Sequence, residues 1–181
     1  MDFTPGIFQT DLSYYGTGST QRVNTTLVKQ LAYYVTMYSP LQMAADLPDN
    51  YERFPDAFQF IKEVAVDWDN SYILEAEPGD YITIARKAKG KNEWFVGGIT
   101  DENSRFSSIN FDYLPKGKKY IATIYADAKD TNWNEKPQNY VISKVAVTSK
   151  SKLKQYIAPG GGYAISIKEA TNAELKGTKK I

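Results

Sequence analysis

Residues 71–167 contain eight short segments rich in Val, Ile, Tyr and Phe, and turn residues separate each segment from the next. In several of them apolar side chains alternate with other residues, as Tyr163, Ile165 and Ile167 do. This period of two is typical of a strand with one buried face. The segments therefore predict an antiparallel β-sandwich or barrel. The expected strands are 71–76, 81–87, 93–99, 106–111, 120–126, 140–147, 152–157 and 163–167.

The residues before this region have a helical pattern instead. Apolar residues recur at steps of three and four over 22–38, which predicts a helix with one buried face. A short helix is expected over 40–45, because Ser39 can cap it and proline is tolerated at the first helical position. Pro48 is expected to end that helix, and a third helix is expected over 55–64.

A unit of about sixty residues with these helices would bury its own apolar faces poorly. The helices therefore either pack on the sandwich or form the last part of a larger unit that lies upstream. The expected division is a helical part at 1–68, a sandwich at 69–168 and a polar tail at 169–181.

Composition removes several classes of chemistry. The chain has no cysteine and no histidine, which excludes disulfides, thiolate nucleophiles, Cys-rich zinc sites and histidine bases. Carboxylates could still hold a hard cation such as calcium. The net charge of +1 is too small for the chain as a whole to attract nucleic acid or an anionic membrane.

The N-terminal residues have neither the basic nor the apolar region of a signal peptide. No stretch approaches the roughly 20 apolar residues of a membrane span. The chain as given is therefore expected to be soluble.

Several strings, in order along the chain, resemble glycoside hydrolase family 97. They are MDFTPGIF at 1–8, LAYYV at 31–35, YSPLQMAAD at 38–46, WFVGGIT at 94–100 and GGGYA at 160–164. Members of that family are longer α-glucosidases and α-galactosidases with an N-terminal β-super-sandwich, a catalytic (β/α)8 barrel and a C-terminal β-sandwich. The resemblance implies a mainly β fold with N-terminal helices. In that fold the last strand and helix of the barrel precede an eight-stranded antiparallel sandwich.

The resemblance also implies what the chain lacks. It places residues 1–8 at the end of the last barrel strand, 9–21 in the following loop and 22–38 in the last barrel helix. The catalytic acid and base, and most carboxylates that hold calcium in the full-length enzyme, come from earlier strands, so no residue here is assigned a catalytic role. The implied partners are the upstream barrel and N-terminal domain and an α-linked oligosaccharide. The parent enzyme is expected in the periplasm or outside the cell.

The loop after a barrel strand lies at the face where barrel enzymes keep their active sites. The candidates for a sugar pocket are therefore Asp2, Phe3, Thr4, Tyr14 and Tyr15. Asp2 and Asp11 could be interpreted as a pair of catalytic carboxylates. The favoured interpretation gives them structural roles, one at a strand end and one as a loop cap.

The tryptophans suggest different roles. Trp133, in the polar loop 127–139, could stack on a sugar ring, although such loops more often fold back over a sandwich edge. Trp94 is expected in the core, and Trp68 between the helices and the sandwich. Alternating lysines over 150–154 favour a solvated strand edge protected by positive charge.

Three hypotheses follow. The first is a C-terminal fragment of an α-glycosidase, whose sandwich serves packing, stability or oligomerisation. The second is a carbohydrate-binding module, which the aromatic residues favour. The third is a protein-interaction module that self-associates through apolar helix surface.

Overall fold

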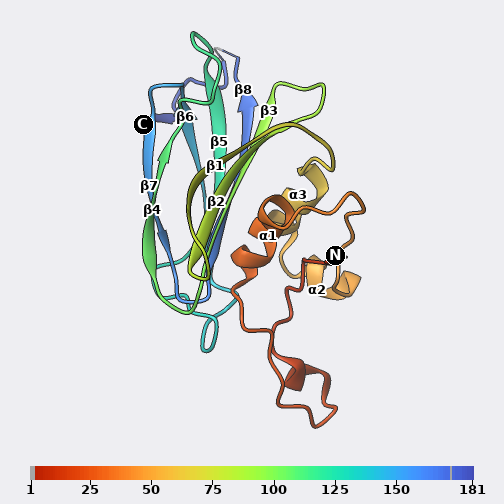
Figure 1. Cartoon of the computed structure of the whole chain (residues 1–181). Helices are drawn as coiled ribbons and strands as arrows, with labels where there is room; N and C mark the ends of the chain where they lie inside the picture. The colour runs from red at the N-terminus through yellow and green to blue at the C-terminus, as the bar shows by residue number, and fades with distance from the viewer. Residues whose placement is uncertain (1–2, 172) are drawn as a thin grey trace.

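The computed structural model describes residues 3–171 and 173–181, and it consists of one large sheet with helices on one face and a small sheet on the other (Figure 1). The helical elements are the short 3-10 helix η1 (Leu12–Tyr15), α1 (Leu27–Thr36), α2 (Pro48–Glu52) and α3 (Pro55–Glu63). The strands are β1 (Trp68–Glu77), β2 (Tyr81–Ala88), β3 (Glu93–Thr100), β4 (Arg105–Asn110), β5 (Tyr120–Asp127), β6 (Tyr140–Val147), β7 (Lys152–Ile157), β8 (Gly162–Glu169) and β9 (Lys179–Lys180).

The large sheet has seven strands in the order β1-β2-β3-β8-β5-β6-β9, and β4 and β7 form the small one. All neighbours are antiparallel except β6 and β9. Each predicted strand segment corresponds to one of β1–β8, so the mainly β class is confirmed. The described residues contain nine strands rather than the eight expected, because β9 lies in the segment predicted as a polar tail. The two lysines of β9 show no alternation that would predict a strand. They form one only because they pair with β6.

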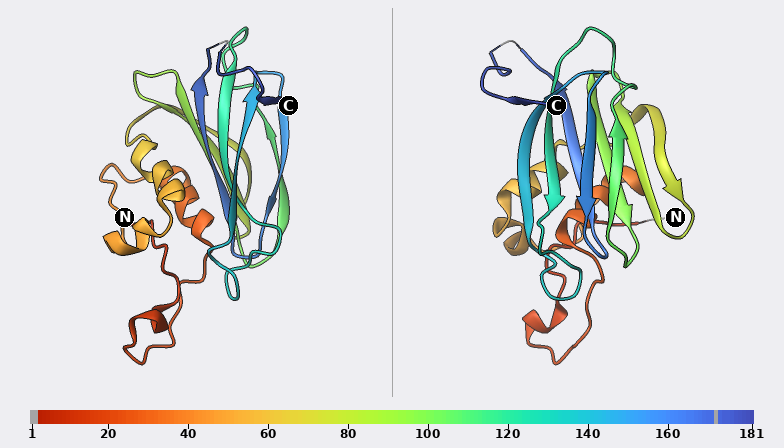
Figure 2. Two further views of the ribbon diagram at one scale, coloured as in Figure 1. Left: turned by 180° about the vertical axis from the view of Figure 1, so that it is seen from behind. Right: turned by 90° about the vertical axis from the view of Figure 1, so that its left-hand side faces the viewer.

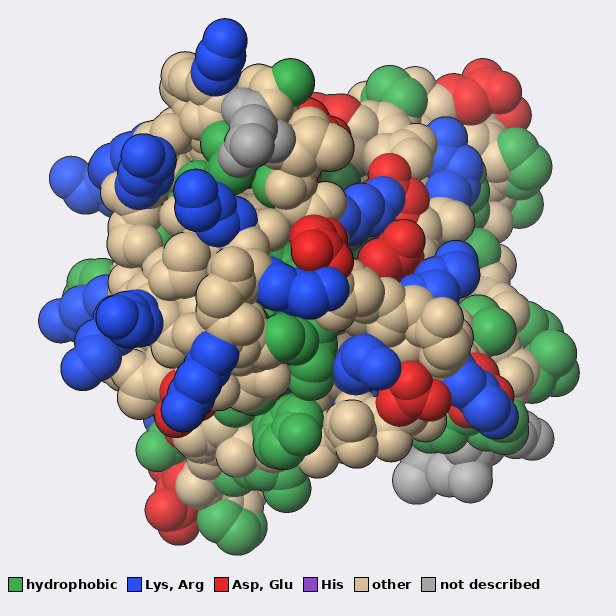
Figure 3. Space-filling view, turned by 90° about the horizontal axis from the view of Figure 1, so that it is seen from above, with side chains coloured by type: hydrophobic (Ala, Val, Ile, Leu, Met, Phe, Trp, Pro, Cys, Tyr) green, Lys and Arg blue, Asp and Glu red, His purple; other side chains and the backbone are tan. Residues whose placement is uncertain are grey.

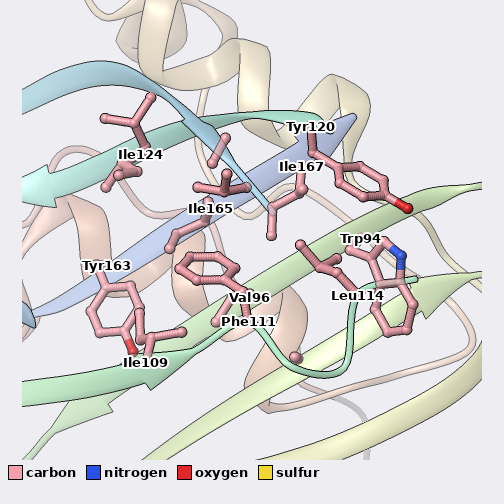
Figure 4. Close-up of a cluster of buried hydrophobic side chains, with 14 of the residues drawn as sticks. Trp94, Val96, Ile109, Phe111, Leu114, Tyr120, Ile124, Tyr163, Ile165 and Ile167 are labelled. Carbon is pink, nitrogen blue, oxygen red and sulfur yellow. The ribbon is translucent and has the colours of Figure 1, made fainter. Parts of the chain in front are cut away.

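The core between the two sheets is apolar and aromatic (Figure 4). Tyr120, Ile165 and Ile167 of the large sheet face Phe111 and Leu114, which lie on the chain between the small sheet and β5. Trp94 is only 3% exposed, which confirms its predicted place in the core. Burial of these side chains supplies the main stabilisation of the sandwich.

Figure 2 shows the helices against the opposite face of the large sheet, and a second core of buried side chains lies between that sheet and the helices. Leu27, Leu31 and Phe60 are fully buried there against Phe95 of β3 and other side chains of the sheet. The helices therefore pack on the sandwich. The other interpretation, which the resemblance to family 97 favours, makes them the last part of a larger upstream unit; this packing does not exclude it, and it stays a prediction. Whether 1–68 and 69–168 are separate domains stays a prediction.

Trp68 lies at the edge of this second core. Its ring centroid is 6.5 Å from that of Tyr38 and 5.9 Å from that of Phe95, both in edge-to-face contact. The predicted position of Trp68 between the helical part and the sandwich is confirmed.

Two adjacent glycines of β3 bring α1 and Tyr163 close to the strand. A Cβ on Gly97 would lie 2.7 Å from the carbonyl oxygen of Ala32 in α1. A Cβ on Gly98 would lie 2.3 Å from the ring of Tyr163 in β8. Glycine is therefore required at both positions, once for each face of the sheet.

The predicted helices differ from the structure at three places. The helix expected over 22–38 is only Leu27–Thr36, because the amide of Val23 instead donates to the carbonyl of Thr10 (2.8 Å) and Thr26 caps the helix. The helix expected over 40–45 is absent. Its backbone is held in an irregular path by bonds such as that from Ala45 N to the carbonyl of Pro5 (3.1 Å). Pro48 begins a helix rather than ending one.

Candidate functional site

The structure places the predicted pocket residues at two positions with different neighbours. Phe3 makes an edge-to-face contact with Tyr33 of α1, with ring centroids 5.2 Å apart. Tyr14 and Tyr15 lie on the loop 11–22, where Tyr15 accepts a hydrogen bond from Asn50 of α2 (2.7 Å). Thr4 is partly buried beside Phe3 in the chain, and Asp2 lies outside the described residues.

Asp11 caps the loop that carries the two tyrosines. Its carboxylate accepts hydrogen bonds from the amide (3.0 Å) and hydroxyl (2.6 Å) of Ser13 and pairs with Arg22 (3.0 Å). The bonds from Ser13 and then from Arg22 lower the pKa of Asp11 to about 2. Its predicted role as a loop cap is confirmed. Tyr14 is 59% exposed, and the Arg53 guanidinium stacks 5.2 Å from its ring centroid.

A groove of 490 Å³ runs along α1 and has a mixed aromatic and charged lining, and we call it the α1 groove. Its lining residues are Lys29, Tyr33, Met37, Ala76, Glu77, Pro78, Gly79, Asp80, Tyr81, Ile82, Ile99, Thr100 and Asp101. Because Tyr33 also contacts Phe3, the groove adjoins one of the predicted pocket residues.

The polar groups of the groove are held in place. The Lys29 ammonium donates to the carbonyl of Thr100 (2.6 Å) and lies 5.9 Å from the Tyr33 ring centroid. Asp101 pairs with Arg105 (2.8 Å), whose guanidinium also stacks 4.4 Å from the ring centroid of Tyr81. The groove therefore offers aromatic surface beside fixed hydrogen-bonding groups, a combination that suits a sugar.

Burial and hydrogen bonds set the pKa values in the groove. Burial lowers the pKa of Lys29 and raises that of Tyr33 to about 12, so Tyr33 remains a neutral phenol at neutral pH. Hydrogen bonds from Asn103, together with those from Arg105 and Thr100, hold the pKa of Asp101 well below its usual range. Asp101 is therefore a carboxylate acceptor at neutral pH.

Behind the groove, the end of β5 places a carboxyl group in the protein interior. Asp127 is 4% exposed, and its Oδ2 accepts hydrogen bonds from the amides of Ala158 (3.1 Å) and Gly162 (2.9 Å). Burial raises its pKa to about 7, although the Thr26 hydroxyl, the two amides and the Lys29 charge oppose the rise.

The glycine string 160–162, which leads into β8 and includes its first residue, has three groups close to its backbone. A Cβ on Gly161 would lie 2.0 Å from Asp127 Oδ2, and one on Gly160 would lie 2.7 Å from Trp133. A Cβ on Gly162 would lie 3.0 Å from Cα of Lys29. Sequence reasoning missed Lys29 and Asp127, because no local pattern links them to this turn.

Trp133 packs on this turn rather than standing free in solvent. Its amide donates to the carbonyl of Pro159 (3.2 Å), and its side chain covers Gly160. The loop 127–139 also reaches the helical part, since Gln138 donates to the carbonyl of Phe8 (2.8 Å). The loop thus folds back over the sandwich end. Sugar stacking by Trp133 stays a prediction.

Neither metal ligands nor a membrane helix are found in the described part of the chain. Within 3–171 and 173–181, no three or more acidic side chains lie together as a metal site requires. None of the helices described there has the length and apolar character needed to cross a bilayer.

Comparison with known proteins identifies close relatives. The family of glycosyl-hydrolase 97 C-terminal domains, described as serving oligomerisation, matches residues 67–168. A retaining α-galactosidase of Bacteroides thetaiotaomicron is 37% identical over 170 residues, which are 93% of this chain and 25% of that protein. A probable retaining α-galactosidase of Streptomyces bingchenggensis is 32% identical over 99 residues, 54% of this chain and 14% of its own length.

Among solved structures, a glycoside hydrolase family 97 enzyme from Pseudoalteromonas sp. strain K8, in complex with acarbose, is 47% identical, with a TM-score of 0.88. The match covers 94% of this chain and 26% of that enzyme. The chain therefore spans about a quarter of the length of the enzymes that it matches over nearly its whole sequence.

Proposed function

The chain belongs to the family of glycosyl-hydrolase 97 C-terminal domains, and from this membership we propose that it is the C-terminal portion of a larger α-glycosidase. The observation that carries the proposal is the match of 94% of this chain to only 26% of a family 97 enzyme. In this proposal the sandwich contributes packing, stability and contacts between subunits, and the catalytic carboxylates lie in the upstream barrel.

The helical part then corresponds to the end of that barrel. Residues 3–8 would continue from its last strand, and α1 would be its last helix, which also packs on the sandwich. Support comes from exposed apolar side chains that follow α1 and have room for a further contact. They are Met37, Tyr38, Leu41, Met43 and Leu47. The pocket candidates Phe3, Thr4, Tyr14 and Tyr15 would then face the substrate in the whole enzyme.

For the parent enzyme, the proposed substrates are α-linked glucosides or galactosides. Both sugars are represented among the relatives, since the Pseudoalteromonas enzyme, solved with acarbose and, as a variant, with panose, shares 47% identity with this chain, and the Bacteroides α-galactosidase shares 37%. The described part of this chain has no acidic cluster that could hold calcium. Calcium in the parent enzyme would therefore be held by other residues. The parent is proposed to act in the periplasm or outside the cell.

The 181-residue chain is expected to hydrolyse neither p-nitrophenyl α-glucoside nor p-nitrophenyl α-galactoside, with or without calcium, because general acid and base carboxylates must flank the scissile bond. Release of p-nitrophenol at pH 5–8 measures this. Turnover that survives repurification would contradict the proposal that the catalytic carboxylates lie upstream.

The proposed contact between subunits is tested by sedimentation velocity. The chain is expected to self-associate as its concentration rises, and a monomer at all concentrations would contradict the subunit contact.

A second candidate function is carbohydrate binding by the chain itself, and the α1 groove favours it. Loss of aromatic stacking in Tyr33→Ala is expected to weaken maltotriose binding roughly tenfold in calorimetry. Trp133→Ala tests whether the sugar stacks on Trp133 instead of in the α1 groove. Tyr156→Ala, on the small sheet, is the matched control. Thermal melting establishes that each variant is folded. Absence of saturable binding by the unmutated chain would eliminate this candidate.

A further inference from the structure

The end of the sandwich that carries the C-terminal segment has a charge unlike that of the whole chain. Three segments far apart in sequence meet there: 112–119 before β5, 148–152 from the end of β6 to the first residue of β7, and the described residues 169–171 and 173–181. Together they hold eight lysines and no arginine, namely Lys116, Lys118, Lys119, Lys150, Lys152, Lys176, Lys179 and Lys180. Their acidic side chains are Asp112, Glu169 and Glu174.

All eight lysines are exposed. Figure 3, which looks onto the molecule from above, shows Lys and Arg side chains gathered over one half of this face with few carboxylates among them. The net charge of +1 conceals this asymmetry, because acidic side chains elsewhere balance it. Of these lysines, Lys118 pairs with Glu169 (2.8 Å), and the local surplus remains strongly positive.

Backbone pairing and hydrogen bonds hold the C-terminal segment against the other two segments. Its strand β9 pairs with β6 at Val145 and Ala146, and the amide of Ile181 donates to the carbonyl of Ala146 (3.3 Å). Ser151 donates from its hydroxyl to the carbonyl of Ile181. The amide of Ala170 donates to the carbonyl of Lys119 (2.9 Å). Lysines from all three segments therefore share one surface.

This surface also contains an apolar hollow. A pocket of 610 Å³ lies among Lys119, Lys176 and Lys180. Its apolar lining comes from Ala146, Val147, Leu175 and Ile181. A free polyanion would gain nothing from such a hollow, whereas an amphipathic anion would fill it and meet the lysines at its rim.

We propose that this lysine-rich end is a peripheral docking surface for an anionic lipid bilayer. Lysine is a compact point charge on a flexible stem, which suits general attraction to lipid head groups. Arginine, the residue suited to bidentate recognition of a single phosphate, is missing from all three segments. The apolar hollow would receive hydrophobic groups from the head-group and acyl boundary.

Co-sedimentation with vesicles tests the proposal. The 181-residue chain is expected to bind phosphatidylcholine vesicles that contain 30% phosphatidylglycerol, and to bind pure phosphatidylcholine vesicles much more weakly. Binding should fall steeply with added salt. Each lysine near an anionic surface contributes about a fivefold factor, so Lys176→Gln/Lys180→Gln should weaken binding about 20- to 30-fold.

The matched control is Lys129→Gln/Lys136→Gln, which removes the same charge from the loop between β5 and β6. Equal losses in the two double variants would mean that only net charge matters, and would overturn the assignment of the surface. Equal binding to the two kinds of vesicle, or binding of inositol hexakisphosphate without binding of vesicles, would overturn the assignment of a bilayer. These readouts do not depend on glycosidase activity.

Discussion

Gly98→Ala is expected to lower the free energy of unfolding by roughly 3 kcal/mol, at the upper end of the usual cost of overpacking a core. The new Cβ would lie 2.3 Å from the Tyr163 ring, which is fully buried. That ring cannot move aside, because its hydroxyl is hydrogen-bonded to Ser107 (2.7 Å) and Thr83 (3.0 Å). Urea denaturation followed by fluorescence measures the change.

The cause can be isolated by a double-mutant cycle. Tyr163→Val removes the ring, so Gly98→Ala should cost at least about 1 kcal/mol less in that background than in the unmutated chain. Gly117→Ala is the matched control, since Gly117 has no neighbour within 4 Å and its cost of about 1–2 kcal/mol comes only from its φ of +81°. Additive effects of the Gly98 and Tyr163 substitutions would contradict the steric account.

Asp127→Asn is expected to remove a pH dependence of stability that amounts to several kcal/mol. The carboxyl group has a pKa of about 7 in the folded chain against 3.8 as the ordinary value, so the folded state binds more protons between these limits. Its contribution to stability is therefore complete below about pH 4 and is lost as the pH rises to about 7. The difference corresponds to a free energy on the order of 4 kcal/mol.

Urea denaturation at pH 5 and pH 8 measures this effect. The unmutated chain should have a lower free energy of unfolding at pH 8 than at pH 5. The Asp127→Asn variant should have nearly the same free energy of unfolding at both pH values, because the side-chain amide oxygen can accept the same two hydrogen bonds without charge. Asp130→Asn is the control, since Asp130 has a surface ion pair with Lys136 and its pKa is lowered by that contact. Parallel pH profiles for the unmutated chain and Asp127→Asn would show that the Asp127 carboxyl group is not the cause.

The strands could be predicted because their signal is local. A half-buried strand needs apolar side chains at every second position, and this pattern is visible in the segment 163–167, where Tyr163, Ile165 and Ile167 alternate with small or polar residues. The helix over 55–64 was predicted nearly to its ends for the same reason, and Pro55 marks its first residue. The segment 40–45 was wrongly predicted as helical because its path depends on a bond to the distant Pro5.

The candidate site was only partly predictable. Asp11 was expected as a loop cap, since its partner Ser13 is two residues away. The α1 groove could not be predicted, because Lys29 and Asp101 meet there across about seventy residues of chain. The resemblance to family 97 named the parent enzyme but gave no reason for its glycine strings. The structure supplies that reason, since helix, ring and carboxylate each approach the backbone at those positions.

The sequence by itself determined the mainly β class, the family and the absence of histidine and cysteine chemistry, because each of these depends on residue types or on short-range periodicity. Only the tertiary structure decided that the helices pack on the sheet, that Asp127 is buried and that eight lysines share one end. The physical reason is that burial and local charge density depend on which distant segments become neighbours. A chain with a net charge of +1 therefore folds into a molecule with one strongly positive end.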